Sequence, residues 1–396
     1  IPGFVDQPVF AERTARFRGE AVAVVIGRPD AMAAFDPESF PVTWAPLDAM
    51  ATPQQALHPD APPLNADLPD NVMCSGFVLH GDPKKALGQA EIVVAGTFTT
   101  GFVEHAYIEP EAGYATPVGD RIEIHACTQA PVMDREALEA ILGWPASRIR
   151  MVPTATGGGF GSKLDVSVQP FLALGALKTG KPVRMAYSRR ESMQSTTKRH
   201  PAEMSARVGA TADGRLCGFE FHGDFNTGAY ASWGPTVSVR VPVHASGPYR
   251  IADYRAEARA IHTNCPPSGA FRGFGVPQGA IAQESLFDEL AEALNIDPLE
   301  FRIRNALGNG DETVCGQVFE QGVGIGACFE ALRPAWDAGR ADCDAFNKTG
   351  GHLRRGIGVA AGWYGCGNTS LPNPSTIKSG LLPDGTFVLH QGAMDV

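Results

Sequence analysis

The chain has 396 residues, with 33 lysines and arginines against 43 aspartates and glutamates, and its formal net charge is −10. This acidic balance argues against a nucleic-acid-binding protein, because such proteins present clustered basic residues to the phosphates. No apolar run reaches the roughly 18 residues that a membrane-spanning helix needs, and the opening residues do not resemble a signal peptide. We therefore expect neither nucleic acid nor membrane as a partner.

The eight cysteines are scattered singly, and none has Cys-x-x-Cys spacing. The absence of Cys-x-x-Cys pairs excludes the usual zinc and iron–sulfur motifs. Isolated cysteines are typical of small buried side chains in a reducing compartment. We therefore expect a cytoplasmic protein with no disulfide framework and no metal ligands of its own.

The first half of the chain alternates between predicted loops, strands and helices. Residues 21–26 and 91–100 are predicted strands, whereas the proline-rich stretch 51–83 indicates a linker or long surface loop. We place a domain boundary near residue 88. Further along, the pattern predicts two helices and two strands, which are helices 134–142 and 164–178 and strands 148–152 and 182–187.

In the second half, residues 203–262 contain short alternating runs broken by Gly and Asp, which predict an antiparallel sheet. Residues 278–294 are the clearest helix, because four apolar residues recur at roughly helical spacing: Ile281, Leu286, Leu290 and Leu294. A second helix is expected at 298–307, and residues 385–396 resemble a strand. Because strand-like segments lie close to both ends, we expect a fragment or a subunit that another chain completes.

The first candidate site is Thr-Gly-Gly-Gly-Phe-Gly-Ser-Lys at residues 156–163, between a predicted strand and a predicted helix. Glycines there permit positive φ and a close approach to a ligand, and free N–H groups at a helix start favour an anionic or oxo group. Ser162 separates the glycine from the lysine of a Walker loop and replaces the third glycine of a dinucleotide fingerprint. A tight strand–helix turn remains the alternative, but Phe160 among glycines favours the wall of a cavity.

The second candidate is Gly-Ala-Phe-Arg-Gly-Phe-Gly-Val-Pro-Gln at residues 269–278. Its glycines expose backbone amides, and Arg272, between two phenylalanines, could bind an anionic group. The alternative is an ordinary loop in which Arg272 forms a surface ion pair.

Two further segments carry polar side chains. In residues 104–111, His105 and Glu109 are four apart, but Pro110 and the strand-like context argue against a helical metal pair, so we expect hydrogen bonds that anchor a strand. Residues 198–201, Lys-Arg-His-Pro, with Glu203 nearby, are either a solvated charge cluster or a cation site for a polar substrate.

Together these motifs resemble the xanthine dehydrogenase/aldehyde oxidoreductase family of molybdenum hydroxylases, and the chain is similar to the front of the split large subunit of nicotinate dehydrogenase. The resemblance covers nearly the whole chain and implies an α+β fold. Residues 1–88 would be the latter part of an α/β hammerhead domain, and residues 89–396 the first molybdopterin-binding domain, of mixed sheets and helices. Five segments carry the match in the family's order: 104–110, 157–163, 198–201, 269–278 and 297–302.

The resemblance also implies a cofactor, molybdopterin as the cytosine dinucleotide with oxo/sulfido molybdenum. Arg199 would orient or polarise a substrate oxygen, Phe274 would stack on a planar substrate, and the Arg272 amide would lie beside the metal's oxo and dithiolene groups. The implied catalytic residues are therefore Arg199, Arg272 and Phe274. The implied cofactor-binding residues are Gly158, Gly159, Phe160, Gly161, Phe271, Arg272 and Gly273.

The implied reaction inserts a water-derived oxygen at an electron-poor carbon of an N-heteroaromatic substrate, nicotinate- or purine-like, with an aldehyde as the alternative substrate. The family's general base is a glutamate in a glycine-rich segment that this chain lacks. The resemblance therefore implies a second molybdopterin-binding chain or segment, together with a 2Fe-2S subunit and an FAD subunit.

Two positions depart from the purine-oxidising branch of the family. That branch has Gln where this chain has Val103, and Glu where it has Leu164, and both changes disfavour xanthine itself. Two other classes were weighed against the hydroxylase. A non-catalytic assembly module would leave the glycine loops purely structural, and a nucleotide-binding dehydrogenase lacks the third glycine of its fingerprint.

Overall fold

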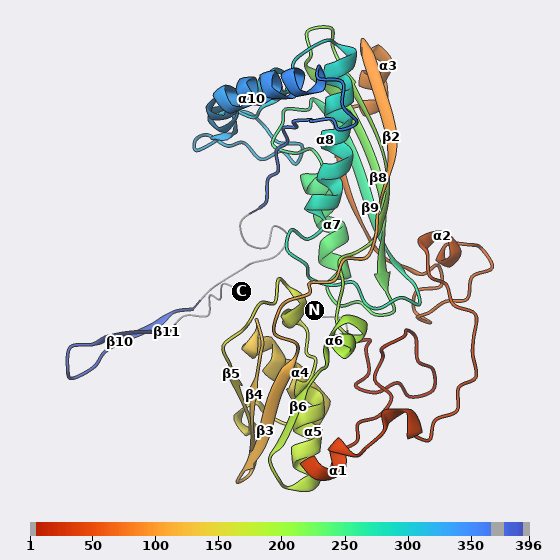
Figure 1. Ribbon diagram of the computed structural model, residues 1–396, viewed down its shortest axis with the longest axis vertical. Helices are drawn as coiled ribbons and strands as arrows, with labels where there is room; N and C mark the ends of the chain where they lie inside the picture. Colours follow the sequence, from red (N-terminus) through yellow and green to blue (C-terminus); the bar gives the residue numbers. More distant parts are fainter. Residues whose placement is uncertain (1–4, 366–375, 391–396) are drawn as a thin grey trace.

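The computed structural model describes residues 5–365 and 376–390. Two sheets, each covered by helices, lie one beyond the other along the molecule (Figure 1), which fits the α+β class expected from the sequence. The helices are α1 (Pro29–Ala33), α2 (Pro53–Ala56), α3 (Pro83–Gln89), α4 (Pro131–Leu142), α5 (Gln169–Thr179), α6 (Arg189–Ser195), α7 (Gly234–His244), α8 (Val276–Ala293), α9 (Pro298–Asn305) and α10 (Ile325–Asn347), with short 3-10 turns η1 (Pro37–Ser39), η2 (Ala146–Arg148) and η3 (Ser162–Leu164). The strands are β1 (Val72–His80), β2 (Ile92–Thr100), β3 (Ala112–Val118), β4 (Arg121–Ala126), β5 (Ile149–Pro153), β6 (Val183–Ala186), β7 (Ala202–Ala210), β8 (Leu216–Gly228), β9 (Asp253–His262), β10 (Lys378–Leu381) and β11 (Phe387–His390).

The larger unit is a five-stranded sheet in the order β1-β9-β8-β7-β2, with α7 and α8 packed on it. Neighbouring strands are antiparallel except β8 and β9, which are parallel. Residues 203–262 therefore do not form the purely antiparallel sheet that we expected. A parallel pair needs a crossover connection, and α7 lies in that connection between β8 and β9, packed mainly on β9 and the edge strand β1.

Helix α8 confirms the clearest helix predicted from the sequence, with one difference in its buried face. Leu286 and Leu290 are fully buried in the core between α8 and the sheet, whereas Ile281 is 47% exposed. Ile281 lies five residues before Leu286, so at about 100° per residue the two side chains point to different sides of the helix. The core stripe therefore excludes Ile281.

Part of the stretch predicted as a linker is regular structure. Strand β1 pairs along its length with β9 and forms one edge of the larger sheet. Its buried and exposed positions roughly alternate, but the exposed ones include Phe77 and Leu79, so the sequence shows no apolar–polar alternation that would have indicated a half-buried strand. Segments on both sides of residue 88 thus contribute to one sheet, and the domain division at that point stays a prediction.

The smaller unit is a four-stranded sheet in the order β5-β4-β3-β6, with α4 and α5 packed over it. Ile122 and Ile124 of β4 are fully buried against Leu138 of α4 and Leu172 of α5. All four elements predicted between residues 134 and 187 are present. Helix α5 begins later than predicted, because residues 162–164 form the separate turn η3, and it ends at Gly180 with φ of 62°.

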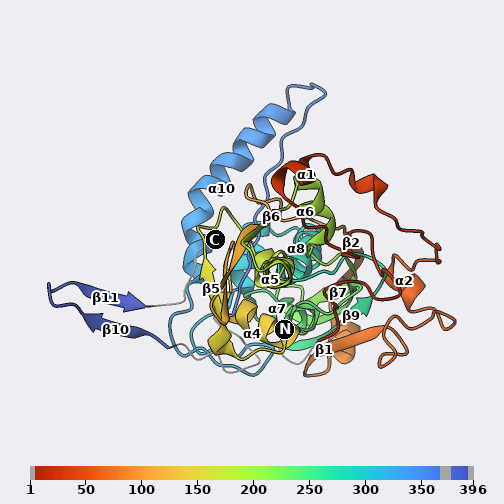
Figure 2. The same ribbon diagram turned by 90° about the horizontal axis from the view of Figure 1, so that it is seen from below.

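The segments outside the two units differ most from expectation. Residues 21–26 form no strand and lie partly exposed along α5, where Ile26 approaches Gly175. Helix α10, which was not predicted, packs on α9 and buries mainly Phe329 and Trp336. The β10–β11 hairpin pairs with itself and extends away from the rest of the molecule (Figures 1 and 2). Strand β11 confirms part of the strand expected at 385–396, and residues 391–396 of that prediction lie outside the described residues. Within the described residues, no helix is both long and apolar enough to cross a membrane.

Candidate active site between the two sheets

Four loops meet where the larger and smaller units join (Figure 1). Two of them are the first glycine loop, residues 157–163 after β5, and the second glycine loop, residues 269–278 leading into α8. The other two are residues 101–111 between β2 and β3, and residues 196–201 between α6 and β7. Backbone bridges join them: Val103 pairs with Arg199, and Lys198 pairs with Ser268.

The two glycine loops are in direct contact. The Arg272 N–H donates to the Phe160 carbonyl over 2.9 Å. A Cβ atom on Gly161, which has φ of 113°, would lie 2.5 Å from the Ala270 carbonyl oxygen, so only glycine permits this approach. Phe160 itself has φ of 51°, a strained conformation for a bulky residue. The two motifs singled out from the sequence are thus brought together, 112 residues apart from Phe160 to Arg272.

The amides at this junction differ from expectation in one respect. The Arg272 N–H is already taken by Phe160, so it is not the free donor that we expected beside a cofactor. Within the described residues, several amides of the two loops have no protein acceptor, among them those of Gly158, Gly159, Phe160, Phe271 and Gly273. Gly159 is buried, and a buried unpaired N–H is costly unless a ligand accepts its proton. Such a donor set fits an anionic or oxo-bearing cofactor.

His105 and Arg199 hold the second glycine loop from two sides. The His105 ring stacks on Phe271 at 4.0 Å between centroids, and its Nε2 donates to the Ala270 carbonyl over 2.9 Å. The Arg199 guanidinium lies 3.9 Å from the centroid of the Phe271 ring and donates to the Arg272 carbonyl over 2.8 Å. Arg199 is therefore a stacked, partly buried cation and not a solvated one.

Burial lowers the pKa of His105 to about 4, so the ring is neutral at pH 7 and acts as a hydrogen-bond donor at Nε2. Residues 101–111 form a loop, with Ala106 at φ of 50°, and not the strand that we expected. Among residues 5–365 and 376–390, no group of three or more His, Cys, Asp or Glu side chains is placed to hold a metal ion.

Two polar contacts that no sequence motif indicated support the glycine loops and the residues next to them. Lys198 forms an ion pair with Glu104 at 2.6 Å, and both side chains are largely buried. The Gln129 side-chain oxygen accepts the Gly161 N–H over 2.9 Å. Gln129 and Glu104 lie far along the chain from the groups they hold, so no local motif could have indicated these pairs.

Phe274 is packed by a different set of side chains from Phe271. The Trp233 ring meets it edge-on at 6.1 Å between centroids, and the Arg240 guanidinium lies 5.5 Å from its ring centroid. Arg240 also lies 4.9 Å from the ring of Tyr364. Phe274 keeps φ of 43°, so its position is constrained by strained backbone as well as by neighbours.

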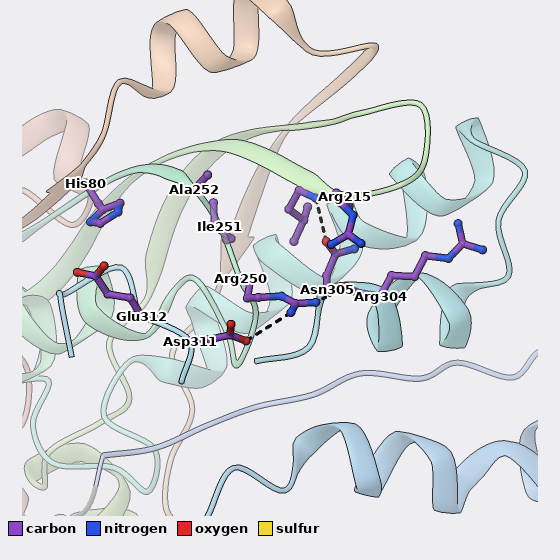
Figure 3. A pocket seen from close by; sticks show the side chains of 10 residues that line it. His80, Arg215, Arg250, Ile251, Ala252, Arg304, Asn305, Asp311 and Glu312 are labelled. Atoms are coloured by element: carbon purple, nitrogen blue, oxygen red, sulfur yellow. Dashed lines mark hydrogen bonds and ion pairs between the residues drawn. The ribbon is translucent and has the colours of Figure 1, made fainter. Parts of the chain in front are cut away.

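A pocket of about 310 Å³ lies at the other end of the larger sheet (Figure 3). Leu216, at the start of β8, lines this pocket. The other end of β8 lies near the glycine loops, where the Ser268 N–H donates to the Thr227 carbonyl. The pocket's three arginines each have an acidic partner, in the pairs Arg215–Asp213, Arg250–Asp311 and Arg304–Glu300. We interpret the pocket as a surface network of balanced charges, separate from the glycine loops.

An α+β chain in which two glycine-phenylalanine loops meet, with amides that lack an acceptor among the described residues, has the construction of a cofactor-binding domain. The comparison with known families agrees: residues 64–306 match the molybdopterin cofactor-binding domain. The chain belongs to this family of molybdenum hydroxylases, whose members are molybdenum-containing oxidoreductases.

Individual relatives cover the chain to different extents. The nicotinate dehydrogenase large molybdopterin subunit of Eubacterium barkeri is 38% identical over 83% of this chain and 77% of its own length. The xanthine dehydrogenase molybdenum-binding subunit of Escherichia coli O157:H7 is 33% identical over 97% of this chain but only 51% of its own length. Among solved structures, the aldehyde oxidoreductase of Desulfovibrio gigas is 29% identical with a TM-score of 0.80, over 87% of this chain and 38% of that one. The chain therefore spans about half or less of the last two proteins.

Proposed function

We propose that this chain is the molybdenum-cofactor-binding subunit of a hydroxylase that inserts a water-derived oxygen at an electron-poor carbon of an N-heteroaromatic substrate, nicotinate- or purine-like. One observation carries the proposal: the first and second glycine loops touch through Phe160 and Arg272, and neighbouring amides have no acceptor in the part of the chain that the structure describes. The 38% identity to a nicotinate dehydrogenase subunit supports the substrate class.

In this proposal the glycine loops hold molybdopterin, as the cytosine dinucleotide, with their unpaired amides. The bound group supplies the redox centre that accepts an electron pair from the substrate. The chain's part is to seat that group in a strained, preformed cradle. The amides proposed to face the cofactor are those of Gly158, Gly159, Phe160, Phe271 and Gly273. Gly161 and Arg272 contribute by shaping the cradle, because their N–H groups are taken by Gln129 and Phe160.

Arg199 and Phe274 are the proposed substrate-facing residues, with Arg272 beside the cofactor. Arg199 donates from one terminal nitrogen to the Arg272 carbonyl and from the other to Gln278 Oε1 over 3.5 Å, and its remaining N–H groups can orient a substrate carbonyl or carboxylate. Phe274 offers a flat apolar surface for a heteroaromatic ring. Val103, 47% exposed beside Arg199, adds an apolar side chain where purine-oxidising relatives carry an amide, so nicotinate fits better than xanthine.

Partners follow from the same proposal. The remaining cofactor contacts and the general base would come from a second molybdopterin-binding chain or segment. A 2Fe-2S subunit and an FAD subunit would carry the electrons away, in a cytoplasmic complex. An aldehyde is the second candidate substrate, favoured by the TM-score of 0.80 to an aldehyde oxidoreductase.

Elemental analysis and a substrate screen test this proposal. The protein purified in its native assembly should contain molybdenum and a pterin, and it should oxidise nicotinate faster than purines or benzaldehydes. Arg199→Met should lower turnover by about 100-fold, since misplacing a substrate by about 1 Å has effects of that size. Arg207→Met, which removes an exposed arginine from a surface pair, is the matched control.

Three results bear on the alternatives. Absence of molybdenum from the intact assembly would sink the enzyme proposal and favour a non-catalytic assembly module. Preferential oxidation of benzaldehydes would move the substrate to the aldehyde class. Unchanged turnover in Arg199→Met would remove Arg199 from the substrate site.

A further inference from the structure

We infer that Glu109 is a positioning residue that ties the two ends of the first glycine loop together. The importance of this for a cofactor rests on the proposed function, whereas the tie itself is a property of the chain. Glu109 lies in the loop between β2 and β3, about 50 residues before the loop it holds. Glu109 takes no part in the hydrogen bond between Phe160 and Arg272 that joins the two glycine loops.

A single carboxylate oxygen of Glu109 receives both ends of the loop. Its Oε2 accepts the Gly157 N–H over 2.7 Å and the Lys163 Nζ over 2.8 Å. Two backbone contacts reinforce the tie: Lys163 Nζ also donates to the Glu109 carbonyl over 3.1 Å, and the Glu109 N–H donates to the Gly157 carbonyl over 3.3 Å.

Burial makes this arrangement specific. The Lys163 side chain is 2% exposed, and its ammonium lies 4.5 Å from the centroid of the Tyr107 ring. A largely buried cation must be paired, and Glu109 is the carboxylate that pairs it. A Cβ atom on Gly157 would lie 2.6 Å from the Glu109 Cβ, so the close approach of the two segments also requires glycine.

The loop needs such a tie because its backbone is strained. Gly158, Phe160 and Gly161 have φ values of 96°, 51° and 113°. Strained conformations persist only where surrounding contacts determine them. Gln129 holds the middle of the loop through the Gly161 N–H, and Glu109 closes its two ends. Together they fix the stretch that carries the amides of Gly158, Gly159 and Phe160, which have no acceptor among the described residues.

Hydrogen–deuterium exchange of the peptide covering residues 154–163 tests the inference on the protein in its native assembly. Glu109→Ala should speed exchange in this peptide by about tenfold or more, the factor that corresponds to about 1.4 kcal/mol. Glu109→Gln should give an intermediate rate, because its amide oxygen still accepts from Gly157 and Lys163 but no longer balances the buried Lys163 charge. Pterin content should follow the same order.

Glu284→Ala is the matched control. Glu284 also joins two donors through one buried carboxylate, Arg302 and Tyr249, but it lies between α8 and α9. It should lower the melting temperature and leave exchange in residues 154–163 unchanged. If Glu109→Ala does not fold, Lys163→Met replaces it, because that variant removes one end of the tie while keeping most of the side-chain volume.

The outcomes separate the inference from the proposed function. Wild-type exchange of the loop in Glu109→Ala, or in Lys163→Met in its place, would overturn the positioning role. So would faster exchange spread evenly over the chain, as in a general loss of stability. A wild-type assembly without molybdenum would refute the proposed function and leave the exchange result standing as a test of the tie.

Discussion

The glycine loops show how far residue-level reasoning reaches. Glycines next to Phe160 and Phe274 are informative in sequence, because an aromatic between glycines has no ordinary role in a turn. The residues that hold these loops could not be found in this way. His105 was expected to anchor a strand and instead donates to the Ala270 carbonyl of a loop. Gln129, which accepts the Gly161 N–H, belongs to no motif in the sequence. Each acts on a group more than 30 residues away, and no local pattern encodes that distance.

Gly161→Ala should disrupt the site more than its backbone strain alone explains. The new Cβ would lie 2.5 Å from the Ala270 carbonyl oxygen, so the two glycine loops must separate. Overpacking of this kind costs about 1–3 kcal/mol in addition to the strain. We expect a lower melting temperature and a loss of pterin from the purified protein.

Gly180→Ala isolates the strain contribution. Gly180 has φ of 62°, and a Cβ atom there meets nothing within 4 Å. We expect a loss of about 1–2 kcal/mol from the left-handed conformation alone, with pterin content preserved. Equal pterin content in the two variants would show that the contact between the glycine loops is not needed to retain the cofactor.

At the scale of elements, the missed helix α7 explains the error in sheet topology. Between residues 237 and 243, Val recurs at every second position, which is the period of a strand. Pro235 in the first turn favours a helix start, and the parallel pairing of β8 with β9 requires a crossover connection. Tertiary context therefore overrode the local alternation. By contrast, α4, α8 and α9 had consistent helical patterns and were predicted close to their observed bounds.

The contact between α4 and α5 makes stability depend on pH through Asp134. This buried carboxyl accepts a hydrogen bond from Gln169 over 3.0 Å, and burial raises its pKa to about 7. The folded chain therefore binds a proton that the unfolded chain, with a pKa near 3.8, releases. The contribution of Asp134 to stability should therefore fall as pH rises from about 4 to about 7 and should be constant above that range.

Asp134→Asn should remove this slope, because an amide does not titrate and its oxygen can still accept from Gln169. Melting temperatures of variant and wild type at pH 5 and pH 8 measure the difference. Asp120→Asn, at an exposed turn, is the control and should leave the wild-type dependence unchanged. The same dependence in Asp134→Asn as in wild type would exclude Asp134 as its source.

At the scale of the whole molecule, the site belongs to neither sheet alone. The smaller unit contributes the first glycine loop, and the larger unit contributes the second glycine loop and Arg199. Their meeting depends on how the two units pack, which is a long-range property. The sequence could indicate which loops bear the chemistry, since their composition is local. Only the family resemblance indicated that the loops would meet.

The site loops leave apolar side chains in the open, which bears on the proposed partner chain. Phe102, Val103, Ile108 and Phe160 are 43%, 47%, 92% and 36% exposed. Large exposed apolar patches mark sites where a partner or ligand binds. Under the proposed function this surface is covered by the second molybdopterin-binding chain or segment, so Ile108→Ser should weaken that association. Burial of one such side chain contributes about 1.5–3 kcal/mol, and the dissociation constant should therefore rise by about 10- to 100-fold.

The stability of the chain without its partner should be unchanged by Ile108→Ser. At 92% exposure, Ile108 contributes little to folding, so the free energy of unfolding should stay within about 0.5 kcal/mol of wild type. Leu353→Ser removes another apolar side chain, 74% exposed after α10, and should change neither quantity. Sedimentation of the purified assembly over a dilution series measures the dissociation constant, and denaturant titration measures stability. We expect the partner at Ile108 because a completed site must exclude water from the loops around this residue. Equal dissociation constants for Ile108→Ser and wild type would instead place the partner on another face.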